Sequence, residues 1–278
     1  MVADITGAPS RTIVDRALQV LDDGGARGCE KDTGDGAGIL CGIPDRFMRR
    51  VAADLSVDLP PPREYAVGNV FLDRCEDGTA EGKRIFEKVL ASIDGLRMIT
   101  WRRVPVESDC LGKAATDHEP TIEQAFIAAE GELKKDVKKF EAALFVLRKR
   151  AANLAAQQPG LPFYVCSLSP RIINYKGMLT CPGLVRYFRD LQEHDFESHV
   201  ALVQSGFSTN TLPAWRRAHP FRHICHNGEI KTLKGNVNFA RAREGLMKSE
   251  LLGPQLEQCF PLLELVTSSD ADSDAEFQ

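Results

Sequence analysis

The sequence has no long hydrophobic run and no leader-like start. No apolar stretch approaches the roughly 20 residues that a membrane-spanning helix needs. Residues 1–10 have neither a basic region nor an apolar core of the secretory type. These absences predict a cytoplasmic protein without a membrane partner.

Concentrated charge is also missing. The net charge is −4 and the sequence pI is about 5.9, and the basic residues are spread among acidic ones without forming blocks. Because nucleic-acid binding requires a gathered basic surface, we expect no DNA or RNA partner.

Paired cysteines are absent as well. The eight cysteines stand singly, with no C-x-x-C pair and no short-spaced framework. This pattern excludes a disulfide scaffold of the secreted type. We therefore expect reduced thiols, several of them in the core.

The chain does have an ordinary globular composition, with 278 residues that are 43% hydrophobic and 27% charged. No internal repeat, low-complexity linker or composition shift divides it, so we expect one domain over residues 1–278. Residues 267–278 are acidic and rich in serine, and no closing element follows them. This ending is typical of a domain that is incomplete at its C-terminus.

Hydrophobic periodicity predicts a mixed α and β pattern. Helical spacing from Ile13 to Leu21 follows the N-cap residue Ser10 and must end near Gly24. The apolar spacing of residues 122–129 predicts the start of a long helix that extends towards residue 158. Further strands are predicted at 39–43, 65–71, 96–104, 163–168, 172–175 and 200–203, and further helices at 84–93 and 184–191.

Three histidines, His219, His223 and His226, have a spacing that superficially suggests a zinc site. Pro220 and Gly228 interrupt the helix that would place two of them on one face, and no nearby carboxylate or thiol pair completes a ligand set. The alternative is that these are structural, hydrogen-bonded histidines. We predict no metal site.

The stretch from Thr33 to Gly38 reads Thr-Gly-Asp-Gly-Ala-Gly. It lacks the spacing of a dinucleotide-binding turn and the lysine of a P-loop, and Asp35 would repel a phosphate. Two interpretations remain. One is a turn where backbone segments approach closely, and the other is a loop that needs glycine only for positive φ.

Asn227-Gly228 has two interpretations too. The Asn side-chain N–H and the Gly backbone N–H can both point at the oxyanion that develops during amide cleavage. Asn-Gly is also the strongest short-range signal for a hairpin turn, and the residues alone favour the turn.

A family resemblance reverses that preference. Residues 226–230 read His-Asn-Gly-Glu-Ile, residues 232–236 read Thr-Leu-Lys-Gly-Asn, and residues 242–245 read Ala-Arg-Glu-Gly. Together they resemble the segment typical of the class II glutamine amidotransferase domain of glutamate synthase large subunits. The similarity continues in collinear order through residues 33–39, 101–105, 119–124, 175–179 and 207–211. Nearly the whole chain therefore resembles that domain.

The resemblance implies an α+β protein, a four-layer αββα sandwich of the N-terminal-nucleophile hydrolase type. It implies a glutaminase that releases ammonia from L-glutamine for glutamate biosynthesis. In that family an N-terminal cysteine attacks the side-chain amide, and its own α-amino group is the base. No cofactor is implied for this chain. FMN and an iron–sulfur cluster are expected in the synthase region that receives the ammonia, either another domain or another subunit.

The resemblance also assigns the site residues. Asp274 is our assignment, among the aspartates near the C-terminus, for the residue that binds the substrate amino group. The full set is Asn227 and Gly228 for the oxyanion hole, and Thr209, Asp35, His226 and Asp274 for the substrate.

Several positions depart from the family pattern. The family opens with Cys-Gly-Val-Gly-Phe, and Met1 stands where the phenylalanine would be, so we expect a domain truncated at its nucleophile. Gly206 stands where an arginine would pair with the substrate carboxylate. Residues 23–25, Asp-Gly-Gly, replace a His-Arg-Gly, and Lys231 replaces an asparagine.

These departures leave two hypotheses of different classes. The first is the glutaminase part of a glutamate synthase, inactive as these 278 residues, since losing a covalent nucleophile costs on the order of 10⁶ in rate. None of the eight cysteines is placed to substitute. The second is a catalytically degenerate glutamine-binding or subunit-interaction module.

Overall fold

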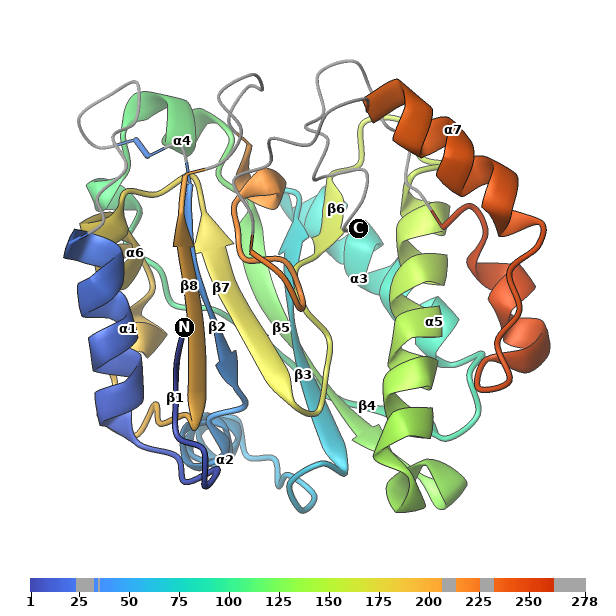
Figure 1. Ribbon diagram of the computed structural model, residues 1–278, viewed down its shortest axis with the longest axis horizontal. Helices are drawn as coiled ribbons and strands as arrows, with labels where there is room; N and C mark the ends of the chain where they lie inside the picture. The colour runs from blue at the N-terminus through green and yellow to red at the C-terminus, as the bar shows by residue number, and fades with distance from the viewer. Residues whose placement is uncertain (24–32, 35, 207–213, 226–232, 263–278) are drawn as a thin grey trace.

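Two four-stranded antiparallel sheets lie face to face at the centre of the structure (Figure 1). The computed structural model describes residues 1–23, 33–34, 36–206, 214–225 and 233–262. The strand order is β1-β8-β2-β7 in the first sheet and β4-β5-β3-β6 in the second. The strands are β1 (Val2–Ala3), β2 (Ala37–Gly42), β3 (Tyr65–Leu72), β4 (Leu96–Arg103), β5 (Thr121–Ala129), β6 (Phe163–Val165), β7 (Ile172–Gly177) and β8 (Val200–Ser205).

Helices cover the outer faces of both sheets. On one side α1 packs against β8 and α6 against β2, and on the other side α3 and α5 pack against the second sheet and each other (Figure 1). The layers are therefore αββα, and the expected α+β sandwich is confirmed. The α-helices are α1 (Arg11–Asp23), α2 (Asp45–Asp54), α3 (Glu76–Leu90), α4 (Lys113–Asp117), α5 (Val137–Ala155), α6 (Cys181–Tyr187) and α7 (Leu233–Glu244). The 3₁₀ helices are η1 (Ser108–Cys110), η2 (Gly131–Lys135), η3 (Arg189–Gln192), η4 (Trp215–Arg217) and η5 (Gly253–Cys259).

Strand β3 shows how the sequence builds the two hydrophobic layers. All eight of its residues are buried, and alternate side chains point to opposite faces. Val67 and Phe71 belong to the core shared with the first sheet, whereas Val70 and Leu72 belong to the core beneath α3 and α5. A strand buried on both faces needs apolar residues at both parities.

A buried polar network joins the sheets. Arg102 of β4 donates two hydrogen bonds of 2.8 Å to the carboxylate of Asp190, and a third of 2.7 Å to Gln124 of β5. Tyr175 of β7 donates to Asp190 at 2.8 Å and accepts from Gln124 at 2.8 Å. Burial, followed by the neighbouring Asp190 carboxylate, raises the pKa of Tyr175. Since these polar groups satisfy one another, they fix how the sheets are aligned.

The prediction of one long helix from residue 122 towards residue 158 is wrong. Residues Thr121–Ala129 form β5, and the helix α5 occupies only Val137–Ala155. Both faces of β5 are buried, so its apolar residues are not confined to alternate positions and happen to match helical spacing. The left-handed Gly131 follows, and the Asp136 side chain accepts from two backbone N–H groups at the start of α5.

The other predicted elements are present with shifted ends. Helix α3 starts eight residues before the predicted residue 84, because the Cys75 side chain accepts from the Gly78 N–H at its N-terminus. Helix α1 is present where helical spacing predicted it, and it is described as far as Asp23; the two glycines predicted to end it lie outside the described residues. In the part of the chain that the structure describes, no helix has the length and apolar character needed to cross a bilayer.

Candidate functional site

Three strand ends meet at one end of the first sheet. Ala37, the first residue of β2, pairs with Ser205 at the end of β8 and with Gly177 at the end of β7. Beyond these pairs, the Gly206 N–H donates to the Gly36 carbonyl at 2.8 Å. The ladder therefore joins Gly36, which follows Asp35 in the sequence, to Gly206, which precedes residues 207–213.

The segment 214–225 lies against the same sheet, and glycine allows this approach. A Cβ atom added at Gly38 would lie 2.3 Å from the His219 carbonyl oxygen, and one added at Gly34 would lie 1.9 Å from the Leu179 carbonyl oxygen. Neither position has room for a side chain. Gly36 has a φ of +145°. Glycine is therefore needed for close backbone approach at positions 34 and 38, and for a positive φ at position 36.

All six residues assigned to the site lie outside the described residues. They are Asn227, Gly228, Thr209, Asp35, His226 and Asp274. The structure does place the direct sequence neighbours of two of them, Gly34 and Gly36 beside Asp35 and Cys225 before His226. Gly36 and Gly206 belong to the corner formed by β2, β7 and β8.

The described histidines of the suspected zinc site do not share a ligand cluster. His219 is buried, and its ring lies 4.5 Å from the Phe221 ring between centroids. Burial, and then the nearby Arg222 and Arg148, lower the pKa of His223. Neither belongs to a group of three ligands among the described residues, and His226 lies outside them.

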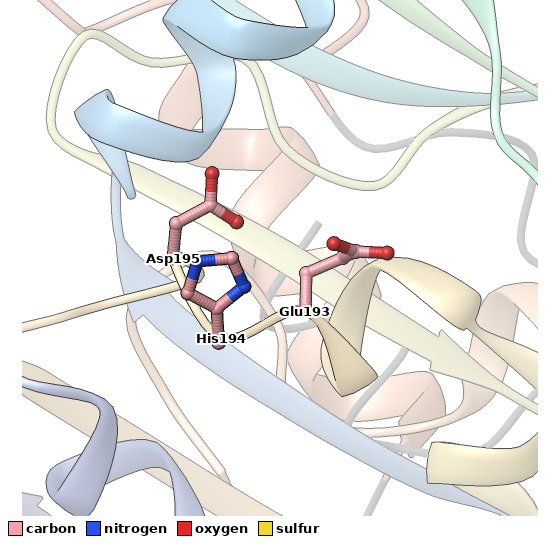
Figure 2. A group of neighbouring side chains, drawn as sticks. All are labelled: Glu193, His194 and Asp195. Atoms are coloured by element: carbon pink, nitrogen blue, oxygen red, sulfur yellow. The ribbon is translucent and has the colours of Figure 1, made fainter.

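One group of potential metal ligands does occur in the described part of the chain. Glu193, His194 and Asp195 are consecutive, and their ligand atoms lie within 4.8 Å of one another (Figure 2). Arg50 of α2 donates to Asp195 at 2.7 and 3.0 Å and to Glu193 at 2.8 Å. These bonds lower the pKa of Asp195. The carboxylates therefore already have a cation, and we interpret the group as an ion pair that attaches α2 to the loop before β8.

A cavity of about 410 Å³ lies between α5 and the residues 221–224. Its lining includes Glu141, Ser169 and His223. Ser169 donates a hydrogen bond of 2.7 Å to Glu141, and burial raises the pKa of that carboxyl group. The cavity therefore separates α5 from residues 221–224, while the same segment contacts β7 on its other side.

Two side chains that hold this segment were not identified from the sequence. Asn174 and Lys176 of β7 are completely buried and donate hydrogen bonds to the carbonyl oxygens of Pro220 and Arg216. Their i, i+2 spacing in a strand places both on one face. A lysine and an asparagine in an otherwise buried strand were the available signal, because such residues are buried only with partners.

Two buried cysteines of the described chain, Cys41 and Cys166, have a thiol pKa too high for a nucleophile. Burial raises the pKa of Cys41 and of Cys166 to about 12. Cys181 is also buried, whereas Cys75 is exposed at the N-terminus of α3, on the outer side of the second sheet. A thiol must ionise to attack a carbonyl, so Cys41 and Cys166 are unsuited to that role.

The αββα layers with two antiparallel sheets are those expected for an N-terminal-nucleophile hydrolase. The sequence matches the family Glutamine amidotransferases class-II over residues 1–277. The chain therefore belongs to the class-II glutamine amidotransferases.

The chain is similar in sequence to several glutamate synthases. The chain is 41% identical over 283 residues to the glutamate synthase (NADPH) large chain of Bacillus subtilis (strain 168), covering 100% of this chain and 18% of the relative. It is 42% identical over 285 residues to the glutamate synthase (NADH) of Saccharomyces cerevisiae, covering 98% and 13%. With the large chain of Azospirillum brasilense the identity is 33% over 280 residues, covering 100% and 18%. The chain thus spans 13–18% of the length of these relatives.

Proposed function

We propose that this chain is the glutaminase domain of a glutamate synthase, one domain over residues 1–278 that binds L-glutamine and serves ammonia release for glutamate formation. The observation that carries the proposal is the family match over residues 1–277. The corner at which β7 and β8 end and β2 begins supports it, because the sequence next to that corner contains the motifs of the resemblance.

The proposed roles follow the chemistry of amide cleavage. Asn227 and Gly228 donate hydrogen bonds to the oxyanion of the tetrahedral intermediate. Thr209, Asp35 and His226 line the pocket for the glutamine side chain, and Asp274 accepts from the substrate α-amino group.

The register of β1 supports a position for the nucleophile. Val2 pairs with Ala201 and Ala3 with Val200 in an antiparallel ladder. If Cys-Gly-Val-Gly is added before Met1 in the same register, it runs along β8 and brings the cysteine opposite Gly206, on the edge of β8 that faces away from β2. We propose that a polypeptide of these 278 residues alone does not hydrolyse glutamine, because residue 1 is methionine and Cys41 and Cys166 are buried with a raised pKa.

The second candidate is a catalytically degenerate module that binds glutamine or a synthase subunit. Gly206 favours it, since glycine cannot pair with the substrate carboxylate as the arginine of the family pattern would. Both candidate functions require a glutamine pocket, and they differ in whether bound glutamine is hydrolysed.

Other components belong to the proposal for the longer enzyme. The expected partner is a synthase domain or subunit that receives ammonia, and FMN and an iron–sulfur cluster would lie there. Iron–sulfur clusters are held by sets of cysteine thiolates, and the one ligand group among the described residues, Glu193 to Asp195, contains no cysteine. The described part of this chain therefore does not fit such a cluster.

Calorimetric titration with L-glutamine tests the pocket, and ammonia release tests turnover. Binding in the micromolar to millimolar range supports the proposal, with D-glutamine as the control. The same chain extended by Cys-Gly-Val-Gly should release ammonia, whereas one extended by Ser-Gly-Val-Gly should do so far more slowly. If the extended chain binds glutamine without turnover, the degenerate module is the better description. No binding by either chain would refute the proposed function.

A further inference from the structure

Lys176 is a buried lysine whose amine lies where two layers and the segment 214–225 meet. Its side chain is completely buried on β7, and its Nζ donates hydrogen bonds of 2.7 Å to the Arg216 carbonyl and 3.0 Å to the Tyr164 hydroxyl. Tyr164 belongs to β6 of the second sheet, so one side chain contacts both sheets and the segment.

Two aromatic rings also lie beside that amine. The Nζ lies 4.4 Å from the centroid of the Phe221 ring and 4.9 Å from that of the Tyr164 ring. A lysine cation over an aromatic face is attracted by the ring quadrupole, and the attraction grows where water is excluded. Phe221 is itself buried, with 2% of its surface exposed. The amine therefore contacts the segment at two places, the Arg216 carbonyl and the Phe221 ring.

Neighbouring contacts fix the residues between these two places. Asn174, two residues earlier on the same face of β7, donates to the Pro220 carbonyl, and the Asn69 side chain supports Asn174 by donating to its carbonyl at 2.8 Å. From β2, Gly38 lets the His219 carbonyl approach closely. Residues 216, 219, 220 and 221 are thus each held by a strand.

From these contacts we infer that Lys176 is a positioning residue for the glutamine site, acting by anchoring the segment that runs directly into Asn227 and Gly228. The inference rests on the proposed function of those two residues. Burying an amine is costly unless its hydrogen bonds are satisfied. One of the acceptors that satisfy it here is the backbone carbonyl of Arg216, in the segment that precedes residue 226 in the sequence. Asn174 supports the same anchor from the adjacent position.

The test compares Lys176→Met with Lys149→Met by hydrogen exchange. Lys149 of α5 is equally buried, with 1% of its surface exposed, and lies near Cys259, so it controls for the loss of a buried lysine. We expect the amides of Arg217 and Phe221 to exchange roughly tenfold faster in Lys176→Met than in Lys149→Met, since one anchoring hydrogen bond and one cation–π contact are lost. Equal exchange in the two variants would overturn the anchor.

Glutamine titration of the same proteins tests positioning. In Lys176→Met the Kd for L-glutamine should rise roughly tenfold, as expected for the loss of one well-placed donor. In Lys149→Met it should stay at the parent value, and Lys176→Arg, which keeps a donor and a positive charge, should recover most of the loss. Unchanged affinity in Lys176→Met would overturn the positioning role even where the exchange result supports the anchor. A parent chain that binds no glutamine fails the proposed function instead, and exchange still decides whether Lys176 anchors the segment.

A milder variant keeps the test decisive if Lys176→Met does not fold. Tyr164→Phe removes only the hydroxyl that accepts from Nζ and leaves the ring in place. Its exchange and its Kd should change in the same direction but by less than in Lys176→Met, since Nζ loses one of its two hydrogen bonds and keeps the one to the Arg216 carbonyl. No change in either quantity would count against the inference.

Discussion

The backbone N–H of Gly206 donates a hydrogen bond of 2.8 Å to the carbonyl oxygen of Gly36, which joins the end of β8 to the glycine stretch before β2. Gly206 has a φ of +78°, a conformation that L residues with side chains adopt at a cost of about 1–2 kcal/mol. The position at which the family pattern has arginine is therefore left-handed in this chain.

Restoring the arginine should strengthen substrate binding. We expect Gly206→Arg to lower the Kd for L-glutamine roughly tenfold, because a bond between charged groups contributes about 1.5–3 kcal/mol and strain offsets part of it. Calorimetric titration measures the effect. Gly160→Arg is the matched control, since Gly160 has a φ of +80° with open space around it, and its affinity should equal the parent's. If the two variants bind alike, Gly206 does not mark a missing carboxylate clamp.

Cysteine labelling should separate buried thiols from exposed ones. At pH 8 a thiol with a pKa of about 12 is ionised to only about 10⁻⁴, so Cys41 and Cys166 should resist iodoacetamide in the native protein while Cys75 reacts. Mass spectrometry of peptides after timed quenching gives the rates. The same reaction in denaturant should label all three. Native labelling of Cys166 as fast as Cys75 would contradict its burial.

The buried pair between Arg102 and Asp190 should matter far more for stability than an exposed pair. Removing Arg102 leaves the Asp190 carboxylate buried without its main cation, so we expect Arg102→Met to lower the free energy of unfolding by about 3–5 kcal/mol. Arg97→Met removes an exposed pair with Glu130 and should cost less than about 1 kcal/mol. Urea unfolding measures both. Equal losses would mean that the network does not align the sheets.

The parts of the fold that follow from local rules could be predicted from the sequence. Helix α1 follows the predicted apolar spacing, and the strand predicted at 65–71 is present as β3. Strand β5 could not be separated from a helix, because burial on both faces removes the period-two pattern. Only the pairing of β5 with β3 and β4 decides its structure, and that is a long-range property.

The frame of the site was predictable only in part. Close approach was one of the two interpretations of the glycine stretch, and Gly38 against His219 fits it. The contacts of Lys176 were not foreseeable, since nothing local in Tyr-Lys-Gly shows that residues 216–221, some forty positions later, pack on that strand. The six residues assigned to the site lie outside the described chain, so their roles stay predictions.

Asp195 and Arg50 should give the protein an acid-sensitive ion pair. The hydrogen bonds from Arg50 hold the pKa of Asp195 below its usual value of 3.8, and only 4% of the Asp195 side chain is exposed. A carboxyl group with a lowered pKa in the folded state contributes stability above the unfolded value. That contribution is lost as the pH falls from about 3.8 through the lower folded value.

Asp195→Asn should therefore destabilise the protein by about 1–3 kcal/mol at pH 7, as expected for losing hydrogen bonds to a charged partner. The difference from the parent should stay constant down to about pH 5 and shrink at lower pH, because the parent then loses the same ionised group. Urea unfolding at pH 7, 5, 4 and 3 measures the difference.

Asp15→Asn, which removes a solvent-exposed pair with Arg11, should change stability at pH 7 by less than about 0.5 kcal/mol. If the effect of Asp195→Asn is the same at pH 3 as at pH 7, the ionised carboxylate is not the source of the stability. In that case the interpretation of Glu193, His194 and Asp195 as an ion-pair attachment for α2 is wrong.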